Sequence, residues 1–335
     1  MDVLQKTFTV QSHRPSLLPA FGSLRVVQAT SSSRVLCASH AEQSDKMKVG
    51  FVGIGIMGFA MANNLIKDGY DLTVWNRNKD KCKALQEKGA KVAESAKAVA
   101  EQCDITVAML ADPQAAEAVA TGPDGIAAGM KAGKGYVDVS TVDAGTAQKV
   151  AKAIKATGAT YLEAPVSGSK QPAENGQLIF LCGGDKDLYE KATPLLKVMG
   201  KAQFFLGEVG NGANMKLVVN MTMGTMMTTL AESLTLADKS GLSQEQLLEV
   251  LGLGVMANPM FKMKGPSMQE HQYPTAFPLK HQQKDMRLAL ELAHQHGQQL
   301  PTAAAANGLY EQAKHMNKSD DDFSAVLEAV LDSKA

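Results

Sequence analysis

The sequence predicts an α/β fold: an N-terminal doubly wound parallel sheet, a long connecting helix and an all-helical C-terminal domain. Up to about residue 208, strand-like apolar runs alternate with helical patterns, which is typical of βα units in a parallel sheet. From residue 209 onward, only helical spacing recurs. A chain of 335 residues is also long for a single domain. We therefore place one domain at 46–208 and a second at 209–335.

A glycine-rich turn separates the first strand from the first helix. Apolar residues run up to Val52, and Gly53-x-Gly55-x-x-Gly58 follows directly. Gly53 permits a tight turn, Gly55 lets a pyrophosphate approach the backbone, and Gly58 lets the helix lie close to the strand. Free N–H groups at the helix start, together with the helix dipole, attract phosphates. This pattern predicts a Rossmann dinucleotide site formed by Gly53, Ile54, Gly55, Ile56, Met57 and Gly58.

The following segments continue the alternation. Strands are expected at 71–75, 104–110 and 135–139, and another strand should end at Glu163. Helices are expected at 79–88, after Asp112-Pro113, and around 147–154. In such a sheet, ligands bind beyond the carboxyl ends of the strands.

The second strand ends without the acidic residue that NAD-preferring enzymes usually have there to accept from the ribose hydroxyls. Instead, neutral Asn76 precedes Arg77, whose guanidinium can pair with a 2′-phosphate and stack on adenine. Lys81 lies one turn further and can assist. Arg77 also fits a solvated surface charge, but the glycine-rich turn upstream favours NADP.

Two other strand ends carry hydroxyl groups and a glycine. Thr141 follows the strand at 135–139, and Ser167-Gly168 follows the next strand. These groups can donate hydrogen bonds to a substrate carboxylate. They are equally ordinary turn residues, so the residues alone leave both interpretations open.

A long helical pattern spans 207–240 and carries Lys216 and Asn220 on one face, at i and i+4. A lysine in the first turn faces the positive end of the helix dipole, which indicates a functional rather than a surface lysine. A methionine-rich stripe should pack against other helices, in this chain or in a partner. Charged and threonine residues argue against a membrane span. Further helices are expected at 244–251, 282–296, 303–314 and 323–331.

Composition limits the other options. The formal net charge is +0 with mixed signs, which argues against nucleic acid as the main partner. The 4 cysteines and the histidines form no metal-ligating spacing, so no metal site is expected. Residues 1–45 are rich in serine and basic residues and poor in acids, as in organelle transit peptides, although a disordered arm would look similar. We expect a chloroplast location, with mitochondrial targeting also compatible.

Four ordered blocks resemble the β-hydroxyacid dehydrogenase family, from about Met47 to the C-terminus. They are 53–58, 138–146, 165–168 with 176–178, and 210–220, and Lys284-Asp285 follows them. The resemblance implies roles for individual residues. Catalysis is assigned to Lys216, Asn220 and Asp285, substrate binding to Thr141, Ser167, Gly168 and Phe277, and cofactor contacts to Thr141 and Lys284 in addition to the glycine turn, Asn76, Arg77 and Lys81.

Residues 74–77, 167–170, 258–261 and 277–285 resemble the family members that reduce glyoxylate to glycolate and succinic semialdehyde to 4-hydroxybutyrate. The implied cofactor is NADPH, and the implied role is aldehyde detoxification under stress in a plant. Chemically, hydride arrival builds negative charge on the carbonyl oxygen, and a lysine ammonium can stabilise that charge and donate a proton. The expected partners are small aldehyde acids and further copies of the chain, as a dimer or tetramer, without nucleic acid or membrane.

Other family members remain alternatives. A 3-hydroxyisobutyrate-type dehydrogenase would prefer NAD, and a 6-phosphogluconate-type enzyme would need a longer chain and a phosphate-binding cluster. A non-catalytic binding module with this fold is the alternative outside enzymes. Chromatin-associated relatives of that kind lose the catalytic lysine, whereas Lys216 is present here.

Overall fold

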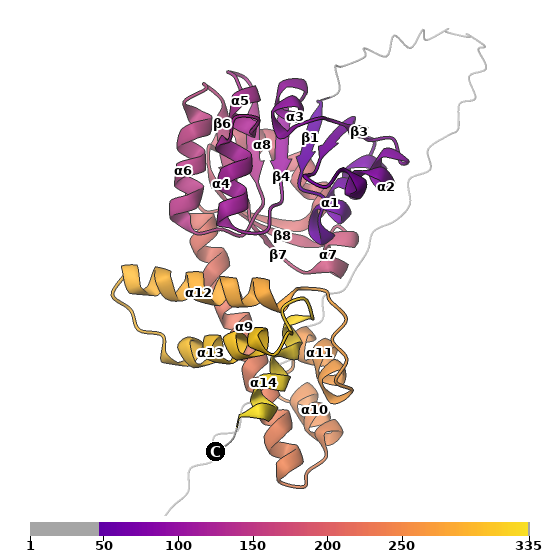
Figure 1. The fold of residues 1–335 in the computed structure, drawn as a ribbon, viewed down its shortest axis with the longest axis vertical. Helices are drawn as coiled ribbons and strands as arrows, with labels where there is room; N and C mark the ends of the chain where they lie inside the picture. The colour runs from indigo at the N-terminus through magenta and orange to yellow at the C-terminus, as the bar shows by residue number, and fades with distance from the viewer. Residues whose placement is uncertain (1–46, 334–335) are drawn as a thin grey trace, which may run out of the picture. The chain divides into compact units, whose positions relative to one another are not determined.

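The computed structural model describes residues 47–333 (Figure 1). The predicted transit peptide at 1–45 lies outside the described residues. Within them, nine strands form one sheet in the order β3-β2-β1-β4-β5-β6-β8-β7, with β9 paired to β8. The strands are β1 (Val49–Val52), β2 (Leu72–Trp75), β3 (Lys91–Val92), β4 (Ile105–Ala108), β5 (Gly135–Asp138), β6 (Thr160–Glu163), β7 (Val166–Ser167), β8 (Leu178–Gly184) and β9 (Gly200–Phe205).

The predicted strands β1, β2, β4, β5 and β6 pair in parallel, as the alternating pattern predicted. The two-residue strand β3, which was not predicted, extends the sheet by pairing in parallel with β2. Strand β1 lies between β2 and β4, so the strand order reverses beside it. A reversal of this kind opens the ligand crevice of a doubly wound sheet. The glycine-rich turn follows β1 at this point.

The far edge of the sheet departs from the parallel pairing of its centre. Strand β8 pairs antiparallel to both β6 and β7, while β9 returns parallel to β8. The segment between β6 and β8 contains only short β7 and the five-residue helix α7 (Lys170–Glu174). Without a longer crossover helix, the chain reverses direction next to β6 instead of crossing the sheet face.

Helices cover both faces of the sheet because successive strand residues point to opposite sides. On one face, α1 (Ile56–Lys67) and α8 (Lys186–Met199) pack on residues such as Phe51 and Leu162. On the other face, helices pack on Tyr136 and Tyr161. Those helices include α3 (Ala96–Gln102), α5 (Ile126–Gly129) and α6 (Ala144–Lys155); α4 (Pro113–Thr121) packs beside α6.

The expected helix at 79–88 is divided. A 3₁₀ turn, η1 (Lys79–Cys82), leads into one turn of α-helix, α2 (Lys83–Gln86). The buried side chains Cys82 and Leu85 lie three positions apart, a spacing that suits either helix type. The apolar spacing therefore could not distinguish the two.

The second half is helical, as predicted. Its elements are α9 (Asn211–Lys239), α10 (Gln244–Leu253), α11 (Pro259–Gln269), α12 (Leu279–Gln295), α13 (Pro301–His315), the 3₁₀ turn η2 (Phe323–Ala325) and α14 (Val326–Asp332). Met227, Leu230 and Leu234 of α9 contribute to its core together with Met286 and Tyr310. Part of the predicted methionine stripe is thus buried within this chain. Within 47–333, no helix has the length and apolar content needed to cross a bilayer.

Helix α11 was not predicted because Pro259, Gly265 and Pro266 interrupt its pattern. Pro259 occupies the first turn, where a missing N–H costs nothing, and Asn258 caps the start by accepting from the N–H of Phe261 at 2.9 Å. Pro266 lies further inside the helix, where tertiary packing offsets its unfavourable helix propensity.

We expect Gly58→Ala to destabilise the protein. A Cβ at Gly58 would lie 1.9 Å from the carbonyl oxygen of Gly53, so the helix start must move away from the turn. The expected loss is about 1–3 kcal/mol of unfolding free energy, measured by urea denaturation without ligand. Gly252→Ala in exposed α10, where a Cβ meets nothing within 4 Å, is the matched control and should be neutral or mildly stabilising. Equal stability of the two variants would contradict the close-packing argument.

Candidate active site

The glycine-rich turn forms an open cradle at the start of α1. Gly53 has a φ of 93° and its Cβ would lie 2.2 Å from the carbonyl oxygen of Met109, so only glycine fits the turn. At Gly55, by contrast, a Cβ would meet nothing within 4 Å. Helix α1 begins there without a side-chain cap or an acidic residue in its first turn. These features fit an anionic ligand group, such as a phosphate, that accepts hydrogen bonds from the free backbone N–H groups.

Several neighbouring helices begin differently. Ser95, Asp112 and Asp143 cap α3, α4 and α6 by accepting hydrogen bonds from backbone N–H groups. The start of α1 therefore contrasts with the starts of these three helices, although α5 and α8 also begin without a side-chain cap. This contrast supports a phosphate position at the turn.

Asn76 joins the end of β2 to the glycine turn. Its Oδ1 accepts from the N–H of Ile54 at 2.9 Å, and its Nδ2 donates to the carbonyl oxygen of Asn78 at 2.9 Å. Arg77 and Lys81 follow on the exposed surface beyond this contact. The structure thus places Asn76 against the turn and leaves both cationic side chains accessible to an anionic ligand.

Lys216 and Asn220 lie buried on one face of α9 and lead to Asp285 on α12. The Lys216 ammonium donates to Asn220 Oδ1 at 2.7 Å, and Asn220 Nδ2 donates to Asp285 Oδ2 at 2.5 Å. All three side chains are at most 5% exposed. Asp285 therefore acts on Lys216 through Asn220 and through its charge. Lys216 lies in the second turn of α9, not in the first as expected, and it is not a surface residue.

Lys284 links this cluster to the sheet. Its ammonium lies 2.9 Å from Asp285 Oδ1 and donates to the carbonyl oxygen of Thr141 at 2.6 Å. Thr141 follows β5, so the bond reaches from α12 to the carboxyl end of a central strand. We call Lys216, Asn220, Asp285, Lys284 and Thr141 the lysine relay.

Burial changes the acidity of Lys216. The pKa of its ammonium is lowered from 10.5 to about 8. Removal from water is the main cause, the Asp285 charge opposes it, and the Lys284 charge adds a smaller lowering. Lys216 is therefore close to exchanging its proton near neutral pH. Two ammonium groups around one carboxylate also leave the cluster with a net positive charge, which suits an anionic ligand.

The remaining predicted site residues are not joined to the relay by a hydrogen bond in the described structure. Ser167 ends β7, and Gly168 follows with a φ of 128° that favours glycine. Phe277 precedes α12 and stacks on His281 with ring centroids 6.4 Å apart. Helix α9 contacts β7, which brings the Ser167 turn next to the helix that carries Lys216.

Sequence reasoning missed the roles of three polar residues near the relay: Gln282 and Glu163 are buried, and His281 is half-buried. Gln282 donates to the carbonyl oxygen of Asn220 at 3.0 Å, and its position three residues before Asp285 on α12 was a detectable signal. His281 lies one turn before Lys284. The pKa of its imidazole is lowered, mainly by burial and to a smaller extent by the Lys284 charge. Glu163 was recognised only as a strand end.

Glu163 holds the start of α9 against the sheet. Its Oε1 accepts from the N–H groups of Gly210 and Gly212, each at 2.7 Å. The Glu163 carboxyl is 2% exposed, and burial raises its pKa to about 7 despite these N–H groups. The residue that ends β6 therefore fixes the helix that positions Lys216.

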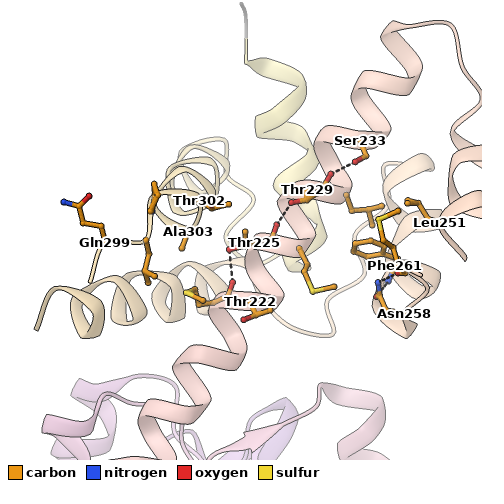
Figure 2. A pocket seen from close by; sticks show the side chains of 16 residues that line it. Thr222, Thr225, Thr229, Ser233, Leu251, Asn258, Phe261, Gln299, Thr302 and Ala303 are labelled. Carbon is orange, nitrogen blue, oxygen red and sulfur yellow. Dashed lines mark hydrogen bonds between the residues drawn. The ribbon is translucent and has the colours of Figure 1, made fainter. Parts of the chain in front are cut away.

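A cavity lies further along α9, away from the relay. It has a volume of about 550 Å³ and is bounded by side chains of α9, α10 and α11 and by the start of α13 (Figure 2). None of the predicted site residues lines it. The hydroxyls of Thr225, Thr229 and Ser233 donate to helix carbonyls four residues earlier, so they are satisfied within α9. The cavity wall is chiefly apolar and does not carry the chemistry described above.

Comparisons with known proteins agree with this architecture. Residues 48–210 match a family model described as the NAD binding domain of 6-phosphogluconate dehydrogenase. Residues 210–330 match one described as NAD-binding of NADP-dependent 3-hydroxyisobutyrate dehydrogenase. The crystal structure of 3-hydroxyisobutyrate dehydrogenase from Salmonella typhimurium is similar with a TM-score of 0.78 and 25% identity, covering 84% of this chain and 99% of that chain.

Two curated relatives are similar over most of the chain. Glyoxylate/succinic semialdehyde reductase 2, chloroplastic, from Arabidopsis thaliana is 54% identical over 322 residues, which covers 96% of this chain and 88% of the relative. Human cytokine-like nuclear factor N-PAC is 44% identical over 284 residues, covering 85% of this chain and 51% of that protein. The glycine turn, the long helix with its lysine and these matches lead to one conclusion: the chain belongs to the β-hydroxyacid dehydrogenase family.

Proposed function

We propose that this protein is an NADPH-dependent reductase of small aldehyde acids, converting glyoxylate to glycolate and succinic semialdehyde to 4-hydroxybutyrate. The observation that carries the proposal is the buried Lys216 ammonium, held by Asn220 beside the carboxyl end of the sheet. The name of the Arabidopsis relative at 54% identity supports this choice of substrates.

The glycine turn is the proposed pyrophosphate site, since it offers an open backbone at Gly55 and an uncapped helix start. Asn76 shapes the turn, while Arg77 and Lys81 would hold the 2′-phosphate of NADPH. Thr141 and Lys284 would contact the nicotinamide end, because the Lys284–Thr141 bond lies at the carboxyl end of β5. When bound there, NADPH supplies the hydride.

Lys216 is the proposed general acid. The two ends of the aldehyde acid are held differently: Ser167, Gly168 and Thr141 orient the carboxylate, and the Lys216 ammonium faces the carbonyl oxygen. As hydride reaches the carbonyl carbon, Lys216 stabilises the growing oxyanion and transfers a proton to it, and it regains a proton from solvent. Asn220 and Asp285 orient the ammonium, and Phe277 closes the site from the start of α12.

The biological setting belongs to the same proposal. We propose a plastid location, with mitochondria as a second destination, a transit peptide at 1–45 and a role in aldehyde detoxification under stress. The relative named chloroplastic supports the plastid location. We further propose a nucleotide-binding domain at 46–208, a helical substrate and oligomerisation domain at 209–335, and assembly as a dimer or tetramer.

Two other functions have specific support. A 3-hydroxyisobutyrate-type dehydrogenase is favoured by the Salmonella structure and by the second family model. A non-catalytic module is favoured by the N-PAC match, although Lys216 and its relay argue for catalysis. Faster turnover with 3-hydroxyisobutyrate than with either aldehyde acid would support the former, whichever cofactor is used, because the matching family model is described as NADP-dependent. No NADPH oxidation with any aldehyde acid would support the latter.

We expect Lys216→Ala to lower kcat for glyoxylate about 10²–10⁴-fold, because the developing oxyanion loses its acid. NADPH affinity, measured by fluorescence titration, should stay close to wild type. Lys239→Ala, at the exposed C-terminal end of the same helix, is the control and should keep full turnover. Near-normal turnover of Lys216→Ala would overturn the assignment.

The reduction rate should depend on the protonation of Lys216. Because the reaction needs the ammonium and its pKa is about 8, kcat/KM at saturating NADPH should fall as pH rises through about 8. Asp285 raises the pKa of Lys216, so Asp285→Asn should move this fall to lower pH. A profile that is flat between pH 7 and 10 would contradict the role of Lys216.

Arg77→Ala should weaken NADPH binding about tenfold and leave NADH binding unchanged, because the lost charge-assisted hydrogen bonds involve only the 2′-phosphate. Dissociation constants for both cofactors, measured by titration, test this. Lys91→Ala, which removes an exposed ion pair with Asp71 on the edge strand, is the control. An equal loss for NADH and NADPH would show that Arg77 does not select the phosphate.

A further inference from the structure

Asp322 is a fully buried carboxylate on which five donors converge. Its exposed fraction is 0%, and the Lys264 ammonium of α11 lies 2.7 Å from Oδ1. Ser324 donates to Oδ1 through its backbone N–H at 3.2 Å and its hydroxyl at 2.8 Å. The backbone N–H groups of Ala276 and Phe277 donate to Oδ2, each at 3.1 Å. Such a network fixes the backbone segments that supply the donors.

Main-chain bonds extend this contact in both directions. The N–H of Asp322 donates to the carbonyl oxygen of Tyr273 at 3.1 Å, and the N–H of Phe323 donates to that of Phe277 at 2.9 Å. Leu279 and Lys280, the first residues of α12, donate to the carbonyl oxygens of Asp321 and Ser319. Segment 319–324 therefore holds segment 273–280 along its length, with the Asp322 carboxylate at the centre.

The segment held in this way carries Phe277. Its ring packs edge-on against Phe323, with centroids 5.8 Å apart, and stacks on His281. Lys264 is also 5.4 Å from the centroid of the Phe323 ring. The Lys264–Asp322 ion pair therefore lies next to the Phe323 ring, which in turn contacts the Phe277 ring. Two residues after Phe277, α12 begins, and it carries Lys284 and Asp285 of the relay.

We propose that Asp322, with Lys264 as its counter-charge, is a positioning residue. It fixes Phe277 in the position from which the ring closes over the bound substrate. It acts through the backbone N–H groups of Ala276 and Phe277 and touches neither substrate nor cofactor. Lys264 supplies the counter-charge that a buried carboxylate requires. This inference rests on the proposed function, since it assigns Phe277 to closure over an aldehyde acid.

Asp322→Asn tests the inference with almost no change of shape. The amide replaces one acceptor oxygen with a donor, so either the loop N–H groups or Lys264 loses its partner. We expect KM for succinic semialdehyde to rise about tenfold, with a smaller change in kcat and no change in NADPH affinity. Hydrogen exchange in a peptide covering 273–280 should accelerate in the same variant.

Asp321→Asn is the matched control because it makes the same chemical change at the adjacent, half-buried residue, which pairs with Lys318 at 3.4 Å. It should leave KM unchanged. In a Phe277→Leu background, Asp322→Asn should raise KM little further, because the ring that it positions is already missing. An unchanged KM in folded Asp322→Asn, or full additivity with Phe277→Leu, would overturn the inference.

Two measurements keep the test decisive. If Asp322→Asn does not fold, hydrogen exchange of the wild-type protein decides: the amides of Ala276 and Phe277 should exchange as slowly as those inside α12. Rapid exchange at both would overturn the inference. Failure of the proposed function is recognised separately, because the wild-type protein would then oxidise no NADPH with either aldehyde acid.

Discussion

The hydrogen-bonded contact between Lys216, Asn220 and Asp285 is the interaction on which the rest of the site depends. A buried ammonium is unfavourable unless its charge is balanced and its N–H groups have acceptors. Asn220 supplies the acceptor and Asp285 the charge, while Lys284 connects the group to the carbonyl oxygen of Thr141. The same burial lowers the pKa of Lys216 to about 8, so the arrangement that holds the lysine also brings its protonation equilibrium close to neutral pH.

The sheet and the helices hold this contact from opposite ends. Glu163, at the end of β6, accepts from the N–H groups at the start of α9 and fixes the helix next to the Ser167 turn. Segment 319–324 holds the start of α12, the helix that carries Lys284 and Asp285 further along its length. The N-terminal end of α9 is thus held by the buried carboxylate of Glu163. The N-terminal end of α12 is held by the segment that contains the buried carboxylate of Asp322. This arrangement limits the movement of Lys216 relative to the strand ends.

Relatives of this chain carry names that point to different functions. A plant protein named as a reductase and a human protein named as a nuclear factor both match most of this chain, so the fold alone does not establish the function. The function has to be argued from the side chains at the site. Here, the lysine and both of its supporting polar residues are present, and the glycine turn is open at Gly55.

The sequence by itself determined the elements whose signals are local. The glycine turn, the parallel strands β1, β2, β4, β5 and β6, the long helix and the shared face of Lys216 and Asn220 follow from spacing along the chain. Tertiary structure decided the features that depend on distant residues. The antiparallel β8, helix α11 with its two prolines and the Asn220–Asp285 bond arise from packing between segments that no periodicity relates. The pKa of Lys216 belongs to the same group, because desolvation depends on everything that surrounds the ammonium.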